Sequence, residues 1–206
     1  MQTINCSAIV LAGGRATRLG GRDKALEPLA GKALIAHVLQ RLRPQVSDIV
    51  INCNRHHEKL AVFGHPLVSD ETPDHAGPLA GIAAALPHCQ QDLVLVAPCD
   101  TPWLPLDLCK RLMTEMNDST NLVIAHDGER LQPLFMLLRR DLLASLNAYR
   151  AAGNHKVESW CMAQNTVIVH FADSRAFANL NTEDELATAR KNEGEKDRSA
   201  FLGESR

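Results

Sequence analysis

The chemistry-bearing residues nearest the start of the chain lie in a glycine-rich segment at residues 12–24. It reads Ala-Gly-Gly-Arg-Ala-Thr-Arg-Leu-Gly-Gly-Arg-Asp-Lys, so three arginines and one lysine accompany a single acid. Glycine has no Cβ and leaves backbone N–H groups open to a ligand. Clustered guanidinium and ammonium groups neutralise an anion held by those N–H groups. The segment predicts a polyphosphate-binding loop, and the alternative is a flexible turn with solvated charges.

Two common phosphate loops do not match this segment. Lys24 is not followed by Ser or Thr, and no glycine lies four residues before a Gly-Lys pair, which excludes a Walker A loop. Arg15 stands where the dinucleotide-binding fingerprint has its second glycine, which excludes that fingerprint as well.

Asp100 follows the most apolar strand that the sequence predicts, at residues 92–97. A carboxylate in this position can hold Mg²⁺, which prefers hard oxygen ligands and keeps several waters. The alternative is a helix cap, but the next predicted helix begins near Pro105, too far along the chain for Asp100 to cap it.

Asn52 and Asp70 also follow predicted strands. A carboxylate such as Asp70 matches two adjacent N–H donors, as guanine presents, and leaving one donor unpaired costs about 1–3 kcal/mol. Asn52 is a candidate for a further base or ribose contact. Each residue could instead be a turn-forming side chain, and the residues alone leave this open.

These residues must be positioned by alternating strands and helices. The apolar periodicity predicts strands at 8–11, 49–51, 67–68, 92–97, 122–125, 134–138 and 167–169. Helices are predicted at 34–42, 56–63, 81–86, 105–116, 141–149 and 155–162, and Thr182 with Glu185 forms a capping box for a last helix. This alternation indicates an α/β fold, a Rossmann-like three-layer α/β/α arrangement with a mostly parallel, mixed central sheet. Ligands of such sheets bind at the carboxyl ends of the strands, where the polar residues above converge.

Length and composition set further bounds. The 206 residues suit one domain at 1–190, with a nucleotide-binding half at about 1–104, a second half at about 105–190 that the resemblance described below implies binds the acceptor, and a disordered tail at 191–206. A net charge of −2 gives no bulk attraction to nucleic acid or to a membrane surface. No apolar run approaches the ~20 residues of a membrane span, and the start lacks the charges of a signal peptide. The six cysteines are scattered, which favours reduced core thiols in a cytoplasmic protein over a zinc site.

The motifs together resemble a known family. Leu11-Ala12-Gly13-Gly14, Arg18 and Lys24 resemble the signature of nucleotidyltransferases, and within them the MobA family of molybdenum cofactor guanylyltransferases, although Leu19 replaces a usual methionine. The segments Gly77-Pro78-Leu79-Ala80-Gly81, Pro98-Cys99-Asp100-Thr101-Pro102 and Asn179-Leu180-Asn181-Thr182 resemble further elements of that family, in the same order. The resemblance implies a nucleotide-diphospho-sugar transferase-like fold and transfer of GMP from GTP to the terminal phosphate of the molybdopterin-type cofactor, with release of pyrophosphate.

The resemblance also implies roles for individual residues. Arg18, Lys24 and Asp100 would be catalytic, with Mg²⁺ on Asp100. The nucleotide would contact those three and a larger set comprising Leu11, Ala12, Gly13, Gly14, Asn52, Asp70, Gly77, Pro78, Leu79, Asn179 and Asn181. We expect a cytoplasmic monomer whose partners are GTP, the acceptor, and other cofactor-biosynthesis proteins and molybdoenzyme chaperones. The alternatives are a cytidylyltransferase or sugar-phosphate nucleotidyltransferase of the same fold, or a non-catalytic nucleotide sensor.

Overall fold

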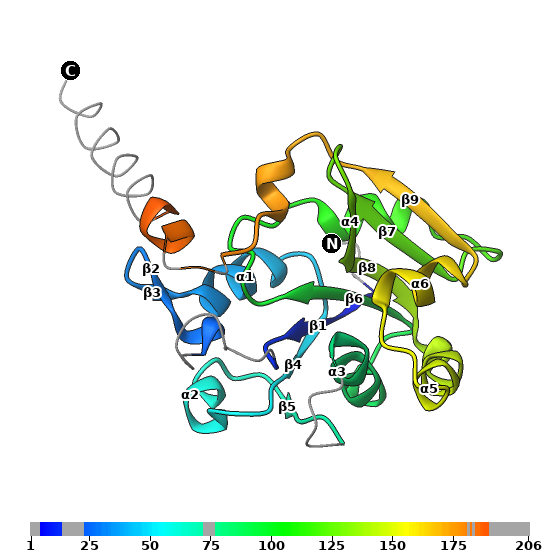
Figure 1. Ribbon diagram of the computed structural model, residues 1–206, viewed down its shortest axis with the longest axis horizontal. Coiled ribbons are helices and arrows are strands. Elements are labelled where there is room, and N and C mark those ends of the chain that lie inside the picture. Colours follow the sequence, from blue (N-terminus) through cyan, green and yellow to red (C-terminus); the bar gives the residue numbers. More distant parts are fainter. Residues whose placement is uncertain (1–4, 14–22, 72–76, 181, 183, 190–206) are drawn as a thin grey trace.

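The computed structural model describes residues 5–13, 23–71, 77–180, 182 and 184–189. Its centre is a seven-stranded sheet in the order β5-β4-β1-β6-β8-β7-β9 (Figure 1). The strands are β1 (Ser7–Leu11), β4 (Asp48–Asn52), β5 (Leu67–Val68), β6 (Leu93–Pro98), β7 (Leu122–His126), β8 (Leu131–Arg139) and β9 (Thr166–His170). Only β8 runs against its neighbours, β6 and β7, and the other pairings are parallel. The mostly parallel, mixed sheet expected from the sequence is confirmed.

Helices cover both faces of this sheet, which makes three layers (Figure 1). The helices are α1 (Leu34–Leu42), α2 (His57–Ala61), α3 (Pro78–Ala85), α4 (Leu108–Thr114), α5 (Leu143–Ala151) and α6 (Val157–Met162), with 3₁₀ turns η2 (Lys24–Leu26), η3 (Leu86–His88), η4 (Arg140–Leu142) and η5 (Ser174–Phe177). Buried residues of α2 and α4 and most of those of α1 form one core, and those of α3, α5 and α6 form another; Leu34 of α1 packs in a smaller third cluster with Leu29 and Leu180. No described helix combines the length and apolarity needed to cross a bilayer.

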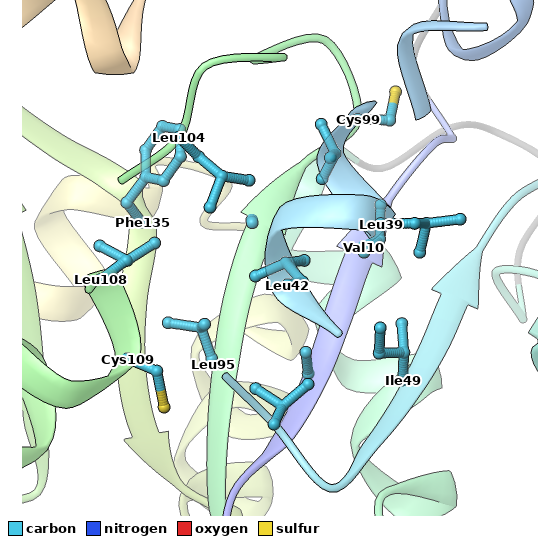
Figure 2. Close-up of a cluster of buried hydrophobic side chains, with 14 of the residues drawn as sticks. Val10, Leu39, Leu42, Ile49, Leu95, Cys99, Leu104, Leu108, Cys109 and Phe135 are labelled. Atoms are coloured by element: carbon cyan, nitrogen blue, oxygen red, sulfur yellow. The ribbon is translucent and has the colours of Figure 1, made fainter. Parts of the chain in front are cut away.

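The two cores follow from the pleat of the strands. Successive side chains of a strand point to opposite faces, so Ala8 and Val10 join the α1 core while Ile9 and Leu11 join the α3 core. Figure 2 shows part of the first core, where leucines of α1 and α4 pack onto β1 and β6. Burial on both faces explains why these strands are continuous apolar runs in the sequence.

Some local features differ from the expectation: β8 begins at Leu131 rather than Leu134, and α3 begins at Pro78. Helix α4 begins at Leu108 rather than near Pro105, and Leu106 is exposed ahead of it. A small hairpin, β2 (Pro28–Leu29) with β3 (Lys32–Ala33), was not predicted. Its two-residue turn places Ala30 and Gly31 at φ of 46° and 76°, the left-handed conformation that matches the twist of paired strands. The predicted tail at 191–206 lies outside the described residues.

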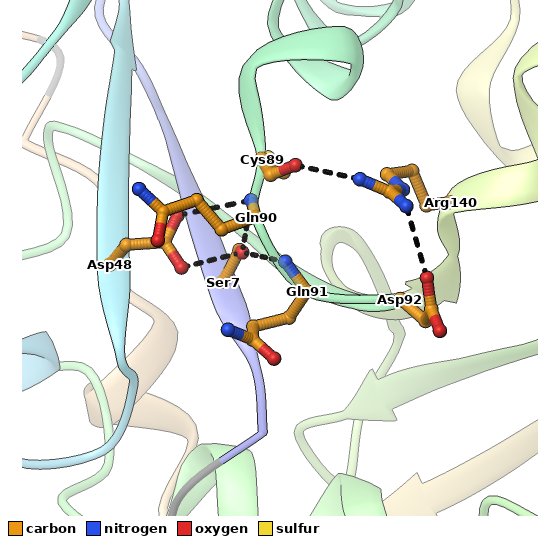
Figure 3. Close-up of polar contacts among 7 residues, drawn as sticks. All are labelled: Ser7, Asp48, Cys89, Gln90, Gln91, Asp92 and Arg140. Carbon is orange, nitrogen blue, oxygen red and sulfur yellow. Dashed lines mark hydrogen bonds and ion pairs between the residues drawn. The ribbon is translucent and has the colours of Figure 1, made fainter.

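At the amino ends of the strands, opposite the expected site, polar groups are paired with one another (Figure 3). The Ser7 hydroxyl donates to Asp48 and accepts from the backbone N–H groups of Gln90 and Gln91, at 3.1 and 2.9 Å. The Arg140 guanidinium donates to the Cys89 carbonyl at 2.9 Å and pairs with Asp92. These contacts fasten the loop before β6 to β1 and β4, so this end of the sheet is structural.

Candidate active site

The carboxyl ends of β1, β4 and β6 border a cavity of about 360 Å³. The three strands end at the same height in the sheet, because Leu11 at the end of β1 pairs with Asn52 at the end of β4 and with Pro98 at the end of β6. Most of the residues expected at the site line this cavity, namely Leu11, Ala12, Gly13, Lys24, Asn52, Asp70, Gly77, Pro78, Asp100 and Asn179. The volume falls in the ~300–1,000 Å³ range of small-molecule sites.

A network of amides orients the carboxylate of Asp70. Asn52 Nδ2 donates to Asp70 Oδ1 at 2.9 Å and to the Val68 carbonyl at 3.2 Å. Asn54 Nδ2 donates to Asp70 Oδ2 at 2.8 Å, and Asn54 Oδ1 accepts from the Asp70 backbone N–H at 2.8 Å. Each carboxylate oxygen keeps a further lone pair for a ligand. Asp70 is therefore a fixed double acceptor, and both N–H donors of the Asn52 amide are already used.

Two glycines make room for the Asn52 side chain. A Cβ at Gly81, in the middle of α3, would lie 2.2 Å from Asn52 Oδ1 and 2.8 Å from its Cγ. A Cβ at Gly13 would lie 3.0 Å from the same oxygen and 3.2 Å from Asn54 Nδ2. Asn52 is 2% exposed, so almost none of its side chain is open to solvent. The two glycines thus fix where Asn52, and through it Asp70, can lie.

Asp100 and Lys24 face each other on the other wall of the cavity. Lys24 Nζ lies 3.7 Å from Asp100 Oδ2. Burial raises the pKa of the Asp100 carboxyl, and the Lys24 ammonium offsets that effect only in part. Lys24 is placed by η2, where Asp23 Oδ1 accepts from the Ala25 N–H at 3.1 Å. This wall therefore carries a carboxylate whose ionised form is disfavoured by burial, and an ammonium group lies close to it.

The segment that contains Asn179 and Leu180 is hydrogen-bonded to the cavity wall that carries Asp100. The Leu180 N–H donates to the Asp100 carbonyl at 2.9 Å, which holds Asn179 at the cavity. Cys99 also lines it, but burial and the charges of Asp100 and Asp23 raise the pKa of its thiol, so it is protonated and unsuited to nucleophilic attack at neutral pH.

The N-terminus of α3 forms the remaining part of the site. Gly77 precedes the helix with φ of 81°, a conformation that favours glycine, and Pro78 occupies the first turn. Leu79, expected among the binding residues, points its fully buried side chain into the core and does not line the cavity. Gly14, Arg18 and Asn181 lie outside the described residues, and their predicted roles stay predictions.

With this geometry in place, known proteins provide the comparison. A family model described as the MobA-like NTP transferase domain matches residues 8–167. A protein of Shewanella sp. (strain ANA-3) named molybdenum cofactor guanylyltransferase is 45% identical over 89% of this chain and 94% of its own length.

The chain belongs to the MobA-like NTP transferase family.

Solved structures agree with this membership. Molybdopterin-guanine dinucleotide biosynthesis protein A from Archaeoglobus fulgidus superposes with a TM-score of 0.76 at 25% identity, covering 92% of this chain and 99% of its own. A CMP:2-keto-3-deoxy-manno-octonic acid synthetase shares the fold, with a TM-score of 0.72 at 14% identity over 93% and 99% of the two chains. The expected nucleotide-diphospho-sugar transferase-like architecture is therefore confirmed, as is the resemblance to the molybdenum cofactor guanylyltransferases.

The carboxylates of the first cavity suit Mg²⁺ that is bound together with a nucleotide. The described part of the cavity presents the carboxylates of Asp23, Asp70 and Asp100 and the ammonium of Lys24. Mg²⁺ is bound through one or two carboxylates, with substrate phosphates and waters completing its shell. Among the described residues, no three His, Cys, Asp or Glu side chains gather into a site of their own. Asp100 can thus serve as a single hard oxygen ligand for a metal that arrives with phosphates.

Five cavity or network residues were not among the expected site residues: Asn54, Asp23, Pro98, Cys99 and Leu134. The Asn-Cys-Asn spacing of Asn52 and Asn54 was the available signal for the first, since alternate residues of an extended segment point the same way. Leu134 gave no such signal, because it lies near the start of β8, and only the antiparallel direction of β8 brings that start to the carboxyl ends of the other strands.

Proposed function

We propose that this protein transfers GMP from GTP to the terminal phosphate of the molybdenum-bound molybdopterin cofactor and releases pyrophosphate. Family membership and the names of the relatives support the reaction class. The observation that carries the choice of nucleotide is the carboxylate of Asp70, held by Asn52 and Asn54 at the cavity wall.

Asp70 is proposed to bind the guanine base. Guanine presents its N1–H and N2–H₂ donors side by side, and a carboxylate with a free lone pair on each oxygen accepts both. Adenine and cytosine present one amino donor beside an acceptor nitrogen on this edge. Either base would place that acceptor against a carboxylate oxygen, at a cost of about 1–3 kcal/mol for the unmatched polar group.

Lys24 and Asp100 are proposed to act on the triphosphate. Mg²⁺ bound to Asp100 would supply charge neutralisation at the phosphates. When the nucleotide enters, the Lys24 ammonium can contact its phosphate oxygens while staying near Asp100, because the two groups are 3.7 Å apart. Lys24, with Arg18, then neutralises the charge that develops on the departing pyrophosphate.

The transfer itself needs no nucleophile from the protein. An oxygen of the acceptor's terminal phosphate attacks the α-phosphorus in line, a new P–O bond forms, and the bond to the pyrophosphate oxygen breaks with its electron pair. The protein contributes positioning and charge neutralisation, which are the main sources of rate in phosphoryl-type transfer.

The experiment combines a choice of nucleotide with a metal titration. Purified protein and acceptor are incubated with labelled GTP, ATP or CTP, and the transferred nucleotide and pyrophosphate are measured at several Mg²⁺ concentrations. We expect transfer from GTP only, and we expect Asp100→Asn to lower turnover by at least a hundredfold while weakening GTP binding modestly, since metal charge stabilisation is worth several kcal/mol. Equal use of CTP would favour the cytidylyl alternative. Wild-type turnover by Asp100→Asn would contradict the assignment of the metal ligand.

A further inference from the structure

A second cavity, of about 480 Å³, adjoins the first one and has no role in the nucleotide contacts described above. The two cavities share Pro98, Leu134 and Asn179 in their walls, so they lie side by side. A molecule in the second cavity would therefore lie next to a nucleotide in the first. Its distinctive lining residues are Arg130, Gln132 and Glu158.

The direction of β8 explains how these residues reach the site. Val96 of β6 pairs with Met136 of β8 in antiparallel register, so the start of β8 lies beside the carboxyl end of β6. Arg130 is the last residue of the turn that joins β7 to β8, and Gln132 is the second residue of β8. Glu158 comes from the first turn of α6, whose buried residues pack in the same core as Met136.

The turn between β7 and β8 is held rigidly by Asp127, which is 5% exposed. Its Oδ1 accepts from the backbone N–H groups of Glu129 and Arg130 at 2.9 and 2.8 Å, and its Oδ2 accepts from Gln132 Nε2 at 2.6 Å. Burial alone would raise the pKa of Asp127, but these hydrogen bonds and the nearby Arg130 guanidinium hold it below its usual value. Asp127 thus fixes the backbone of Arg130 and the side chain of Gln132.

Arg130 itself remains available to a ligand. Its Nε lies 3.9 Å from Asp127 Oδ2, the limit of an ion pair, and its side chain is 76% exposed. Surface pairs of this kind contribute about 0–1 kcal/mol, so little is lost when the guanidinium turns to an anion. An arginine held in this way offers a fork of donors that fits a phosphate.

The cavity therefore offers two opposite kinds of contact. Arg130 supplies a cation, and the exposed carboxylate of Glu158 supplies an acceptor for N–H donors. A matching ligand carries an anionic phosphate and, elsewhere, a heterocycle with adjacent N–H groups. A pterin bearing a phosphate has both, because its ring presents a ring N–H beside an amino group.

We propose that this second cavity is the acceptor subsite, where Arg130 binds the anionic arm of a phosphorylated pterin and Glu158 accepts from the N–H groups of its ring. Asp127 is a positioning residue that holds Arg130 and Gln132 in the cavity wall. This proposal rests on the proposed function for the identity of the acceptor. The proposal assigns acceptor binding to residues of the second half of the chain, outside the nucleotide cavity.

The test separates acceptor affinity from nucleotide affinity. Arg130→Ala, Arg130→Lys and Glu158→Gln are compared with the wild type for the KM of the acceptor, the KM of GTP and the calorimetric Kd of GTP. We expect Arg130→Ala and Glu158→Gln each to raise the acceptor KM about tenfold or more, the loss of one charged hydrogen bond, and to leave both GTP constants within twofold. Arg130→Lys should recover part of the loss. The control is Arg150→Ala, which removes a half-buried arginine of α5 that contacts Asn147 and should change none of the constants.

Asp127→Asn provides an independent check of positioning. It should raise the acceptor KM in the wild-type background and have a smaller effect in the Arg130→Ala background, because the part of its effect that passes through Arg130 is then already lost. An acceptor KM that is unchanged in Arg130→Ala and Glu158→Gln would overturn the proposal.

A direct measurement of molybdopterin binding tests the acceptor subsite separately from the proposed transfer reaction. The Kd of molybdopterin is measured for the same variants without nucleotide. If the wild type binds molybdopterin in an Arg130-dependent manner but transfers no GMP, the subsite stands and the proposed function fails. If molybdopterin binding is absent, or is indifferent to both Arg130 and Glu158, the subsite is wrong whatever the transfer assay shows.

Discussion

The substitution Gly81→Ala tests whether the base site depends on the packing of Asn52. The added Cβ would lie 2.2 Å from Asn52 Oδ1, so the amide must move away by at least about 1.2 Å to reach an ordinary contact distance of 3.4 Å. That movement breaks the bonds from Asn52 Nδ2 to Val68 and Asp70, at 3.2 and 2.9 Å. The contact to Leu11, 3.2 Å away, involves the tip of a flexible side chain and costs less.

The expected magnitude follows from two opposing effects. Two lost hydrogen bonds cost about 2 kcal/mol, at about 1 kcal/mol each. Replacing a helical glycine by alanine returns about 1 kcal/mol through helix propensity. The free energy of unfolding should therefore fall by about 1 kcal/mol. The affinity for GTP should fall about tenfold, because Asp70 loses one of the two amides that orient it.

The decisive assay is a double-mutant cycle with Asn52→Ala. Urea unfolding and GTP calorimetry are run on the wild type, both single variants and the double variant. Asn52→Ala removes the atoms that the new methyl would strike, so Gly81→Ala in that background should raise the free energy of unfolding by about 1 kcal/mol, the helix propensity alone. If Gly81→Ala causes the same loss in both backgrounds, the proposed contact with Asn52 is refuted.

Three further predictions concern other parts of the chain. Asp70→Ala should weaken GTP binding and bring it level with ATP and CTP; calorimetry that still shows a preference for GTP would place the base elsewhere. Asp127 has a lowered pKa in the folded protein, so it stabilises the fold above its unfolded pKa of about 3.9, and this contribution is lost as the pH falls through the lower, folded value. Asp127→Asn should accordingly lower the free energy of unfolding at pH 7 and have a smaller effect near pH 3.5, as urea titrations at the two values will show. A variant shortened to end at Lys191 should keep its melting temperature and its turnover, because the composition of residues 191–206 cannot bury enough apolar surface to offset the entropy of ordering; a fall of several degrees would show that the tail docks.

The amino-acid sequence by itself determined the seven strands of the main sheet, the helices that cover it, and the edge of the sheet at which the site lies. Strands buried on both faces must be continuous apolar runs, and α1 must place apolar residues at helical spacing, so both patterns are legible before any contact is known. The carboxyl ends of parallel strands share one edge, which was enough to bring Asp70 and Asp100 to the same cavity.

The tertiary structure alone decided how these side chains meet. The hydrogen bonds from Asn52 and Asn54 to Asp70 cross from one strand to the next, and the role of Gly81 depends on where α3 packs against β4. Periodicity reports which face a residue occupies, whereas such contacts depend on strand order, register and helix placement. For the same reason the second half of the chain was harder to interpret: the start of β8 reaches the cavity only because that strand runs against its neighbours, and a local sequence pattern does not encode the direction in which a strand joins a sheet.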